Sequence, residues 1–330
     1  RDLHSFPTRR SSDLFLQAVI RSDRGFFGVN PVGVNLDATF PRGAPPPSAL
    51  GGLGWVRFGY RVSMSTGSED IQAAFNRYLP LAEAYKKAGL KVLFTTSHET
   101  YGEAKGFPPW PNMGDEDWTR LIQRFAEMMA RIAKQWAGRG LVDAWQVWNE
   151  QDAPIGAQAS VPMSARNYTR MLTQLIPAIR ANDGEVLVLT GGHTGGPLRG
   201  GAYARESIQG LPSDLRPDGV ACHPYGRGPQ PGEPYAIFGH IDDEVQAFAS
   251  VMPDKPIWIT EWGVLDRPND DPARILAYAS SFVNHLKGRY VGQIAAIIWY
   301  AWVQGMHNGY GVVDASGNPR PPFTSSFLKL

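Results

Sequence analysis

Short apolar segments alternate along this chain with longer segments whose apolar residues recur every three or four positions. The short segments are rich in β-branched and aromatic residues, and this pattern predicts eight strands. They lie at 33–36, 55–61, 91–97, 142–148, 185–190, 219–223, 256–260 and 294–299. Several are apolar at consecutive positions, which is typical of parallel strands that are buried on both faces.

The longer segments predict helices between the strands. The clearest is 115–136, which begins with three acidic residues and is followed by Gly138, as expected at the two ends of a helix. Its apolar stripe consists of Trp118, Leu121, Ile122, Phe125, Met129, Ile132 and Trp136. Further helices are predicted at 71–88, 165–181, 241–250 and 273–286, with a short final helix within 321–330.

Strands that alternate with helices imply parallel βαβ units. Eight such units predict an α/β protein with one domain, a (β/α)8 TIM barrel, which typically needs about 250 residues plus insertions. The first unit is the least well defined. An open, doubly wound sheet is the alternative, but the sequence has neither GxGxxG after an early strand nor GxxxxGK[ST].

The first residues of the chain stand apart from this pattern. Residues 1–14 ("RDLHSFPTRRSSDL") are similar to a translated short-read sequencing adapter, and we exclude them as a non-native segment. A native polar tail is the alternative. On the adapter interpretation the natural N-terminus and any signal peptide are missing, and we expect a catalytic domain over 15–330 that is clipped at both ends.

Charge and composition exclude several classes of partner. The net charge of +1 equals that of residues 1–14, which hold three arginines and two aspartates, so 15–330 is neutral. A neutral chain gives no electrostatic case for nucleic acid or an anionic membrane. The longest apolar run, 294–303, is shorter than the roughly 20 residues of a membrane span. Cys222 is the single cysteine, which excludes an internal disulfide and a cysteine-based zinc site. We expect a monomer.

Polar side chains stand at the ends of the predicted strands. A (β/α)8 barrel builds its active site at the C-terminal ends of its strands, so these side chains should converge. They are Arg57, His98, Asn149, Glu150, His193, His223, Tyr225, Glu261 and Trp299. Glu150 follows the fourth strand and Glu261 the seventh, so we expect them to face each other across one pocket. Two carboxyl groups about 5–5.5 Å apart are what a retaining glycosidase uses.

This combination of motifs resembles the clan A glycoside hydrolases, especially families 5 and 39, over residues 26–324. The resemblance rests on "VRF" in the second strand, "WNE" after the fourth, "HPY" after the sixth and "TEWG" at the end of the seventh. It implies that Glu150 is the acid/base, that Glu261 is the nucleophile, and that no metal or organic cofactor is needed.

The resemblance also implies roles for neighbouring side chains. Asn149 would bond the 2-hydroxyl of the sugar, and Arg57 and Tyr225 would keep Glu261 ionised. His223 would lie at the rim of the subsite where cleavage occurs, and Trp299 would form the floor beneath that sugar. The alternatives are a surface ion pair for Arg57 and a core position for His223.

Other aromatic residues are candidates for sugar binding. The longest insertion at the predicted catalytic face, 99–114, contains Tyr101, Phe107 and Trp110, on which sugar rings could stack. Trp262 and Trp302 are further candidates. For each of them the alternative is packing within its own loop. The glycine-rich "GGHTGG" at 191–196 is interpreted as a flexible barrel loop without a helix start after it.

These observations favour an enzyme that hydrolyses β-glycosidic bonds of an oligosaccharide or polysaccharide with retention of configuration. Endo-β-glucanase action is the first expectation and exo-action the second. A metal-dependent barrel hydrolase that uses His98, His223, Glu150 and Glu261 is a second class, although HxH and HExxH spacings are absent. A non-catalytic carbohydrate-binding barrel is a third. Because soluble glycan hydrolases usually act outside the cytoplasm, the expected location is secreted or periplasmic.

Overall fold

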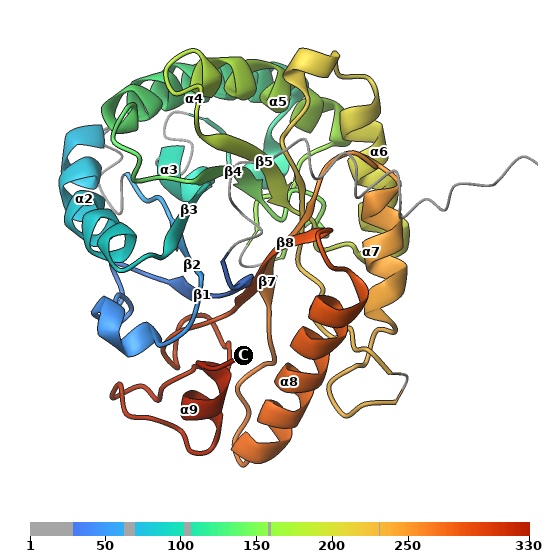
Figure 1. The fold of residues 1–330 in the computed structure, drawn as a ribbon. Coiled ribbons are helices and arrows are strands. Elements are labelled where there is room, and N and C mark those ends of the chain that lie inside the picture. Colours follow the sequence, from blue (N-terminus) through green and yellow to red (C-terminus); the bar gives the residue numbers. More distant parts are fainter. Residues whose placement is uncertain (1–28, 63–69, 102–106, 158–159, 231) are drawn as a thin grey trace, which may run out of the picture.

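The computed structural model describes residues 29–62, 70–101, 107–157, 160–230 and 232–330. Eight parallel strands form one sheet in the order β5-β4-β3-β2-β1-β8-β7-β6. Parallel bridges between Leu189 and Gly219 and between His193 and Cys222 join the two edge strands and close the barrel (Figure 1). The strands are β1 (Val32–Leu36), β2 (Trp55–Gly59), β3 (Lys91–Thr96), β4 (Ala144–Asn149), β5 (Leu187–Gly192), β6 (Val220–Cys222), β7 (Ile257–Trp262) and β8 (Ile294–Trp299).

Helices surround the barrel (Figure 1). Those between successive strands are α2 (Ile71–Lys87), α3 (His98–Tyr101), α4 (Asp115–Trp136), α5 (Ala165–Arg180), α6 (Gly201–Gln209), α7 (Ile241–Ala249) and α8 (Pro272–Arg289), with α9 (Phe323–Phe327) last. All eight predicted strands and the predicted helices are confirmed, with ends that shift by a few residues. The first unit has the short 3₁₀ turn Pro47–Leu50 instead of an α-helix.

Helix α6 was not predicted from the sequence, and the segment before it was interpreted wrongly. The interpretation of 191–196 as a flexible loop was wrong, because Gly191 and Gly192 belong to β5 and Gly196 begins a turn of π-helix that continues into α6. Its glycines hid the helix, since glycine has low helix propensity.

Two apolar clusters stabilise the barrel. One fills its interior near the N-terminal ends of the strands, where the indoles of Trp55 and Trp258 meet edge to face with centroids 5.1 Å apart. The other lies between the strands and the helices, and includes most of the apolar stripe of α4. Because the interior is filled below, the polar ends of the strands are left to form the opposite, open side.

No helix among the residues that the structure describes is long and apolar enough to cross a membrane. Residues 1–14 lie outside the described residues, so their interpretation as an adapter segment stays a prediction.

Candidate active site

A cavity of about 590 Å³ opens at the C-terminal ends of the strands. The predicted site residues that line it are Arg57, His98, Asn149, Glu150, Tyr225 and Glu261. His223 lies beneath them, 2% exposed, and touches both glutamates. The expected convergence of strands two, three, four, six and seven is therefore confirmed by their positions.

The end of β4 departs from regular strand geometry. Ala144 faces the barrel interior and Trp145 the helices, so alternation would turn Trp148 inward. Instead Trp148 has φ +75° and packs outward, with its indole nitrogen donating to the Val161 carbonyl at 2.8 Å. Glu150 also has a positive φ, +50°. These two sparsely populated conformations bring Asn149 and Glu150 to the cavity, and such strain is commonly found at functional sites.

An irregularity in β7 has a similar effect on Glu261. Ile259 pairs with Ile297 and Trp262 with Trp299, so β7 holds one more residue than β8 over this interval. The extra residue acts as a β-bulge, which redirects side chains. Thr260 and Glu261 consequently both face the site, whereas Trp262 points outward and stacks on Phe282 at 4.2 Å.

Glu261 is held as a carboxylate. Its Oε1 accepts from Arg57 at 2.6 Å and its Oε2 accepts from the Tyr225 hydroxyl at 2.9 Å. Burial by itself would raise the pKa of Glu261, but its electrostatic interactions with His223 and Arg57 and the two hydrogen bonds outweigh it. The net effect lowers the pKa of this carboxyl.

Arg57 organises the other side of this network. Its guanidinium donates to Asn149 Oδ1 at 2.8 Å, to Asn35 Oδ1 at 2.7 Å and to Gln146 at 3.2 Å. Since Asn149 uses its oxygen to accept from Arg57, its amide nitrogen is the group that it can offer to a ligand. Arg57 is 3% exposed, which contradicts the alternative of a surface ion pair.

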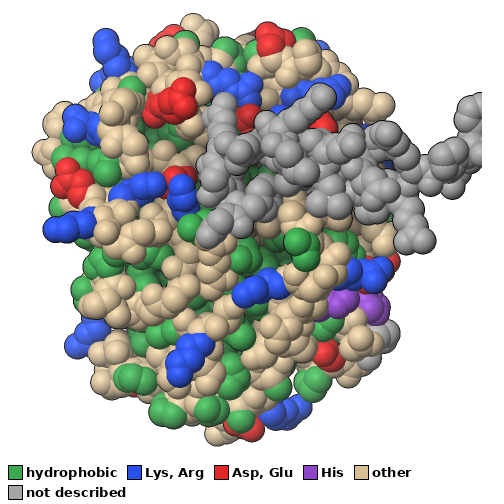
Figure 2. Space-filling model, in the orientation of Figure 1, with side chains coloured by type: hydrophobic (Ala, Val, Ile, Leu, Met, Phe, Trp, Pro, Cys, Tyr) green, Lys and Arg blue, Asp and Glu red, His purple; other side chains and the backbone are tan. Residues whose placement is uncertain are grey.

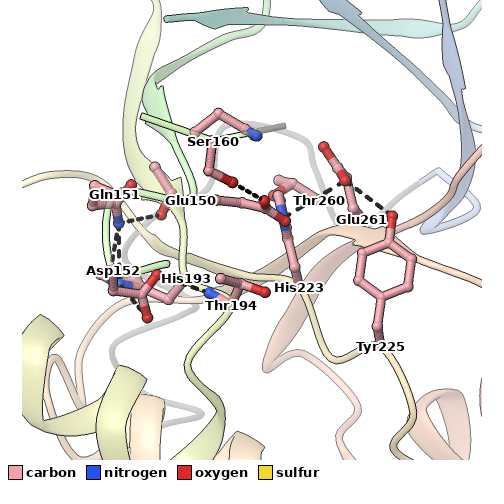
Figure 3. Close-up of polar contacts among 12 residues, drawn as sticks. Glu150, Gln151, Asp152, Ser160, His193, Thr194, His223, Tyr225, Thr260 and Glu261 are labelled. Carbon is pink, nitrogen blue, oxygen red and sulfur yellow. Dashed lines mark hydrogen bonds and ion pairs between the residues drawn. The ribbon is translucent and has the colours of Figure 1, made fainter. Parts of the chain in front are cut away.

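Glu150 has different partners (Figure 3). Its Oε1 lies 3.0 Å from Nδ1 of His223, and its Oε2 accepts from the Ser160 hydroxyl at 2.5 Å. The other ring nitrogen of His223 lies 3.1 Å from the Thr260 hydroxyl. Because Nδ1 also lies 3.7 Å from Oε2 of Glu261, the imidazole contacts both glutamates.

The two carboxylates are close together. Ligand atoms of Glu150, His223 and Glu261 all lie within 4.8 Å of one another, and among the described residues this is the group that could also hold a cation. The metal-dependent hydrolase considered from the sequence would use four residues, and three of them, Glu150, His223 and Glu261, form this group. His98 lines the same cavity but does not belong to this group of donors. The Arg57 guanidinium already supplies a positive charge to Glu261, as a cation would.

The glycines of 191–196 have a structural role beside the site. A methyl group on Gly192 would lie 1.9 Å from Nε2 of His223, and one on Gly191 would lie 2.0 Å from Oε1 of Gln151. Only glycine leaves room for the imidazole there. His193 itself is fully buried behind the cavity, where Gln151 contacts it at 3.0 Å and burial lowers the pKa of the imidazole to about 4.

Three tryptophans predicted to bind sugar belong to the core instead. Trp299 is fully buried and its indole donates to the Tyr310 carbonyl at 2.8 Å, so its assignment as the floor of the cavity was wrong. Trp262 is fully buried against α8, and Trp302 is 5% exposed. Strand alternation turns Trp299 toward the helical layer, and the extra residue in β7 does the same for Trp262.

The aromatic residues of the insertion after β3 pack against their own surroundings. Tyr101 is buried beside Phe125, and Phe107 lies under the guanidinium groups of Arg120 and Arg124, each 5.3 Å from its ring centroid. Trp110 stacks on Trp118 of α4 at 5.8 Å. These three rings therefore pack against the protein, as the alternative predicted, and they do not form platforms for sugar rings.

Several cavity residues were missed by the sequence analysis. They are Asn35, Asp37, Arg61, Glu99 and Tyr300. Each follows a strand or interrupts an apolar one, so the same strand-end rule would have found them. Arg61 joins Asp37 and Glu99 through ion pairs of 3.0 Å each and forms a charged group in the cavity wall. Tyr300, which directly follows Trp299, is the aromatic ring that β8 presents to the cavity.

A (β/α)8 barrel whose fourth and seventh strands end in paired glutamates offers the two carboxyl groups that glycoside hydrolases use. Residues 52–304 match the family model described as Cellulase (glycosyl hydrolase family 5). The chain therefore belongs to glycosyl hydrolase family 5. No curated protein sequence matches it at a significant level.

Solved structures share the fold at low sequence identity. A family 39 glycoside hydrolase from Bacteroides cellulosilyticus WH2 matches with a TM-score of 0.60, 18% identity, and coverage of 90% of this chain and 62% of that one. For an exo-β-1,4-mannosidase from Opitutaceae bacterium strain TAV5 these values are 0.62, 17%, 91% and 58%. For a broad-specificity endoglucanase from Clostridium acetobutylicum they are 0.63, 14%, 91% and 96%. The chain thus spans about three fifths of the length of the first two.

Proposed function

We propose that the protein hydrolyses β-glycosides with retention of configuration, with Glu261 as the nucleophile and Glu150 as the acid/base. The observation that carries this proposal is the approach of the two carboxylates, whose oxygens come within 4.8 Å. Retaining enzymes place these groups about 5–5.5 Å apart, whereas inverting enzymes leave about 6.5–9.5 Å for a water molecule.

The different surroundings of the two glutamates support these roles. In the first step an oxygen of Glu261 forms a bond to the anomeric carbon while Glu150 gives its proton to the departing glycosidic oxygen. The result is a glycosyl ester on Glu261 and a free alcohol. A nucleophile must be ionised, and Arg57 and Tyr225 favour the ionised form of Glu261.

In the second step Glu150 takes a proton from water, whose oxygen attacks the anomeric carbon and displaces the Glu261 carboxylate. Two inversions give net retention. Asn149, with its oxygen bound to Arg57, offers its amide nitrogen to the sugar's 2-hydroxyl. His223 contacts both carboxylates, and these contacts would hold the two groups in the same relative position through both steps.

The family model, together with the endoglucanase among the structural neighbours, makes β-glucan the first substrate to test, with endo-action as the first candidate. Exo-action is the second candidate, and one observation favours it. The ion-paired Asp37, Arg61 and Glu99 place fixed donors and acceptors in the cavity wall, which suits the hydroxyls of a terminal sugar. Chromatography of early products distinguishes the two, because exo-action releases one small product from the start.

Chemical rescue tests the assignment of the glutamates. We expect Glu261→Gly to lose nearly all activity, and azide to restore it with an α-glycosyl azide as product. Glu150→Ala should retain activity on activated aryl glycosides, and azide should there give the β-product. Glu206→Ala, at an exposed glutamate of α6, is the matched control and should behave as the wild type. Azide products of the opposite configuration would reverse the two roles.

Two measurements test the mechanism as a whole. NMR of fresh product should show the β-anomer from a β-linked substrate, and an α-anomer would overturn retention. Activity should survive EDTA, whereas loss with EDTA and recovery with a divalent cation would favour the metal-dependent alternative at Glu150, His223 and Glu261.

We also propose that the enzyme acts as a monomer outside the cytoplasm, where β-linked glycans are found. Cell fractionation of the source organism and sedimentation of the purified protein test these two points.

A further inference from the structure

We propose that the leaving-group side of the cavity binds a hydrocarbon aglycone, so that the enzyme prefers β-glycosides of alkyl or acyl-chain alcohols to those with a sugar as leaving group. This inference rests on the proposed function and deepens it. It is carried by the exposed apolar side chains of the β6–α7 and β7–α8 loops, which line the same cavity as the two glutamates.

The barrel topology divides the cavity into two sides. The two carboxyls flank the scissile bond, so a substrate must cross the line that joins them, with its sugar on one side and its leaving group on the other. That line runs from β4 to β7. Strands β8, β1, β2 and β3 lie on one side of it, and β5 and β6 lie on the other.

The first side is lined mainly by polar groups, with Leu36 and Met306 as apolar members. Its lining from β1, β2, β3 and the residues after them consists mainly of Asn35, Asp37, Arg61, Thr95, Ser97 and Glu99. A sugar carries a hydroxyl on most of its carbons and needs such donors and acceptors. The glycone therefore fits this side, and the leaving group must lie over the loop that follows β6.

The second side, together with the loop after β7 at the end of the dividing line, is apolar and exposed. Ile237 is 64% exposed, Phe238 62% and Leu265 56%, and all three line the cavity together with Tyr235. We call these four residues the apolar rim. Apart from Glu261, Arg267 is the charged side chain that the described parts of these two loops add to the lining. Exposed apolar patches of this kind mark binding sites.

The apolar rim is held in place before any ligand binds. The Phe238 amide donates to the Gly226 carbonyl at 2.8 Å, next to Tyr225, which holds Glu261. A methyl group on Gly226 would meet the Phe238 ring at 2.3 Å, so the loop is packed directly on this glycine. Arg227 ties the start of the loop to Glu244 of α7 at 3.1 Å.

The type of side chain selects hydrocarbon over sugar. Sugar subsites gain affinity from flat aromatic faces with polar groups around them, but the most exposed members of the apolar rim include two branched aliphatic residues, Ile237 and Leu265. Aliphatic side chains contribute binding free energy by packing against a hydrocarbon chain. Each fully buried methylene of such a chain increases the affinity about fourfold.

Chain-length dependence tests the inference. We would measure kcat/KM for methyl, butyl and octyl β-glycosides of glucose, mannose, galactose and xylose, below micelle-forming concentrations, beside the matching β-1,4-disaccharides and aryl β-glycosides. We expect kcat/KM to rise at least about tenfold from methyl to octyl on the preferred sugar. Ile237→Ser and Phe238→Ser should each reduce this ratio severalfold, through a loss of kcat/KM on the octyl glycoside that exceeds any loss on the methyl glycoside.

Val291→Ser is the matched control, because Val291 is 67% exposed and lies in the α8–β8 connection at the opposite end of the barrel. It should leave the octyl-to-methyl ratio unchanged. Equal kcat/KM for methyl and octyl glycosides would overturn this inference and leave the proposed function standing. An octyl-to-methyl ratio that is unchanged in Ile237→Ser and Phe238→Ser would do the same. A dimer that Phe238→Ser dissociates in sedimentation would also overturn it, by making the apolar rim an interface between copies. Failure to cleave any glycoside would overturn the proposed function as well.

Discussion

Arg57 connects four other side chains of the site. It bonds Glu261, Asn149, Asn35 and Gln146 from one buried guanidinium, so it joins residues from β1, β2, β4 and β7. A planar group with five donors can do this, and a lysine ammonium cannot match the same geometry.

We expect Arg57→Ala to lower kcat about 100-fold with a smaller change in KM, because the charged bond to Glu261 acts in the chemical step. Arg57 lowers the pKa of Glu261, so its removal should raise that pKa and move the acid limb of the kcat/KM profile to higher pH. Arg61→Ala, in the same cavity but bonded to Asp37 and Glu99, should mainly raise KM. A rise in KM alone for Arg57→Ala would make it a substrate contact.

Trp299 and Tyr300 are neighbours with different expected roles. Trp299→Ala should lower the free energy of unfolding by about 3–5 kcal/mol, because it removes a fully buried indole from the core. Tyr300→Ala should reduce kcat/KM with a much smaller loss of stability, because its side chain lines the cavity. Urea denaturation and steady-state kinetics on both variants check this. The opposite pattern would restore Trp299 as the sugar-binding ring.

At the scale of elements, the connection between β6 and α7 carries Tyr225 and three residues of the apolar rim, Tyr235, Ile237 and Phe238. It is anchored by the ion pair of Arg227 with Glu244, a residue of α7 that is 1% exposed. Burial raises the pKa of Glu244 to about 7, although Arg227 acts in the opposite direction. Such a carboxyl makes the stability of this region depend on pH.

The sign of that dependence follows from the raised pKa. Glu244 binds its proton more tightly in the folded state, so its contribution is fully present below about pH 4.5 and is lost as the pH rises to about 7. The loss is on the order of 3 kcal/mol. Glu244→Gln removes this titration, so the difference in melting temperature between wild type and variant should change between pH 5 and pH 8, in favour of the variant at pH 8. A constant difference would show that Glu244 is ionised throughout.

At the scale of the whole molecule, the barrel is one sheet closed through β5 and β6, with helices outside and apolar side chains below the site. Positive and negative side chains are both scattered over the face shown in Figure 2. This agrees with the neutral sum for residues 15–330.

Deletion of residues 1–14 should leave both the melting temperature and kcat/KM unchanged, because a translated adapter has no native partners. Differential scanning calorimetry would detect a loss of 1 kcal/mol as a shift of about 2–4 °C. Deletion of residues 323–327 is the contrasting control, because α9 packs Phe323 and Phe327 against Trp299, and it should destabilise the protein. A comparable loss of melting temperature from both deletions would show that residues 1–14 are part of the native protein.

The amino-acid sequence by itself determined the eight strands, the order of strands and helices, and the identity of the two paired glutamates. Hydrophobic periodicity is a local property, and the strand-end rule then follows from the architecture of a barrel, so Glu150, Glu261, Arg57 and Tyr225 could be found without coordinates.

Only the tertiary structure decided which way individual side chains point. Positive φ at Trp148 and the extra residue in β7 override simple alternation, and they moved Trp148 and Trp262 outward while Glu261 came inward. Trp299, by contrast, went to the core by regular alternation along β8. A strand's two faces look alike in sequence when both are buried, and the choice between them depends on pairing register and packing with distant elements, which no local pattern records.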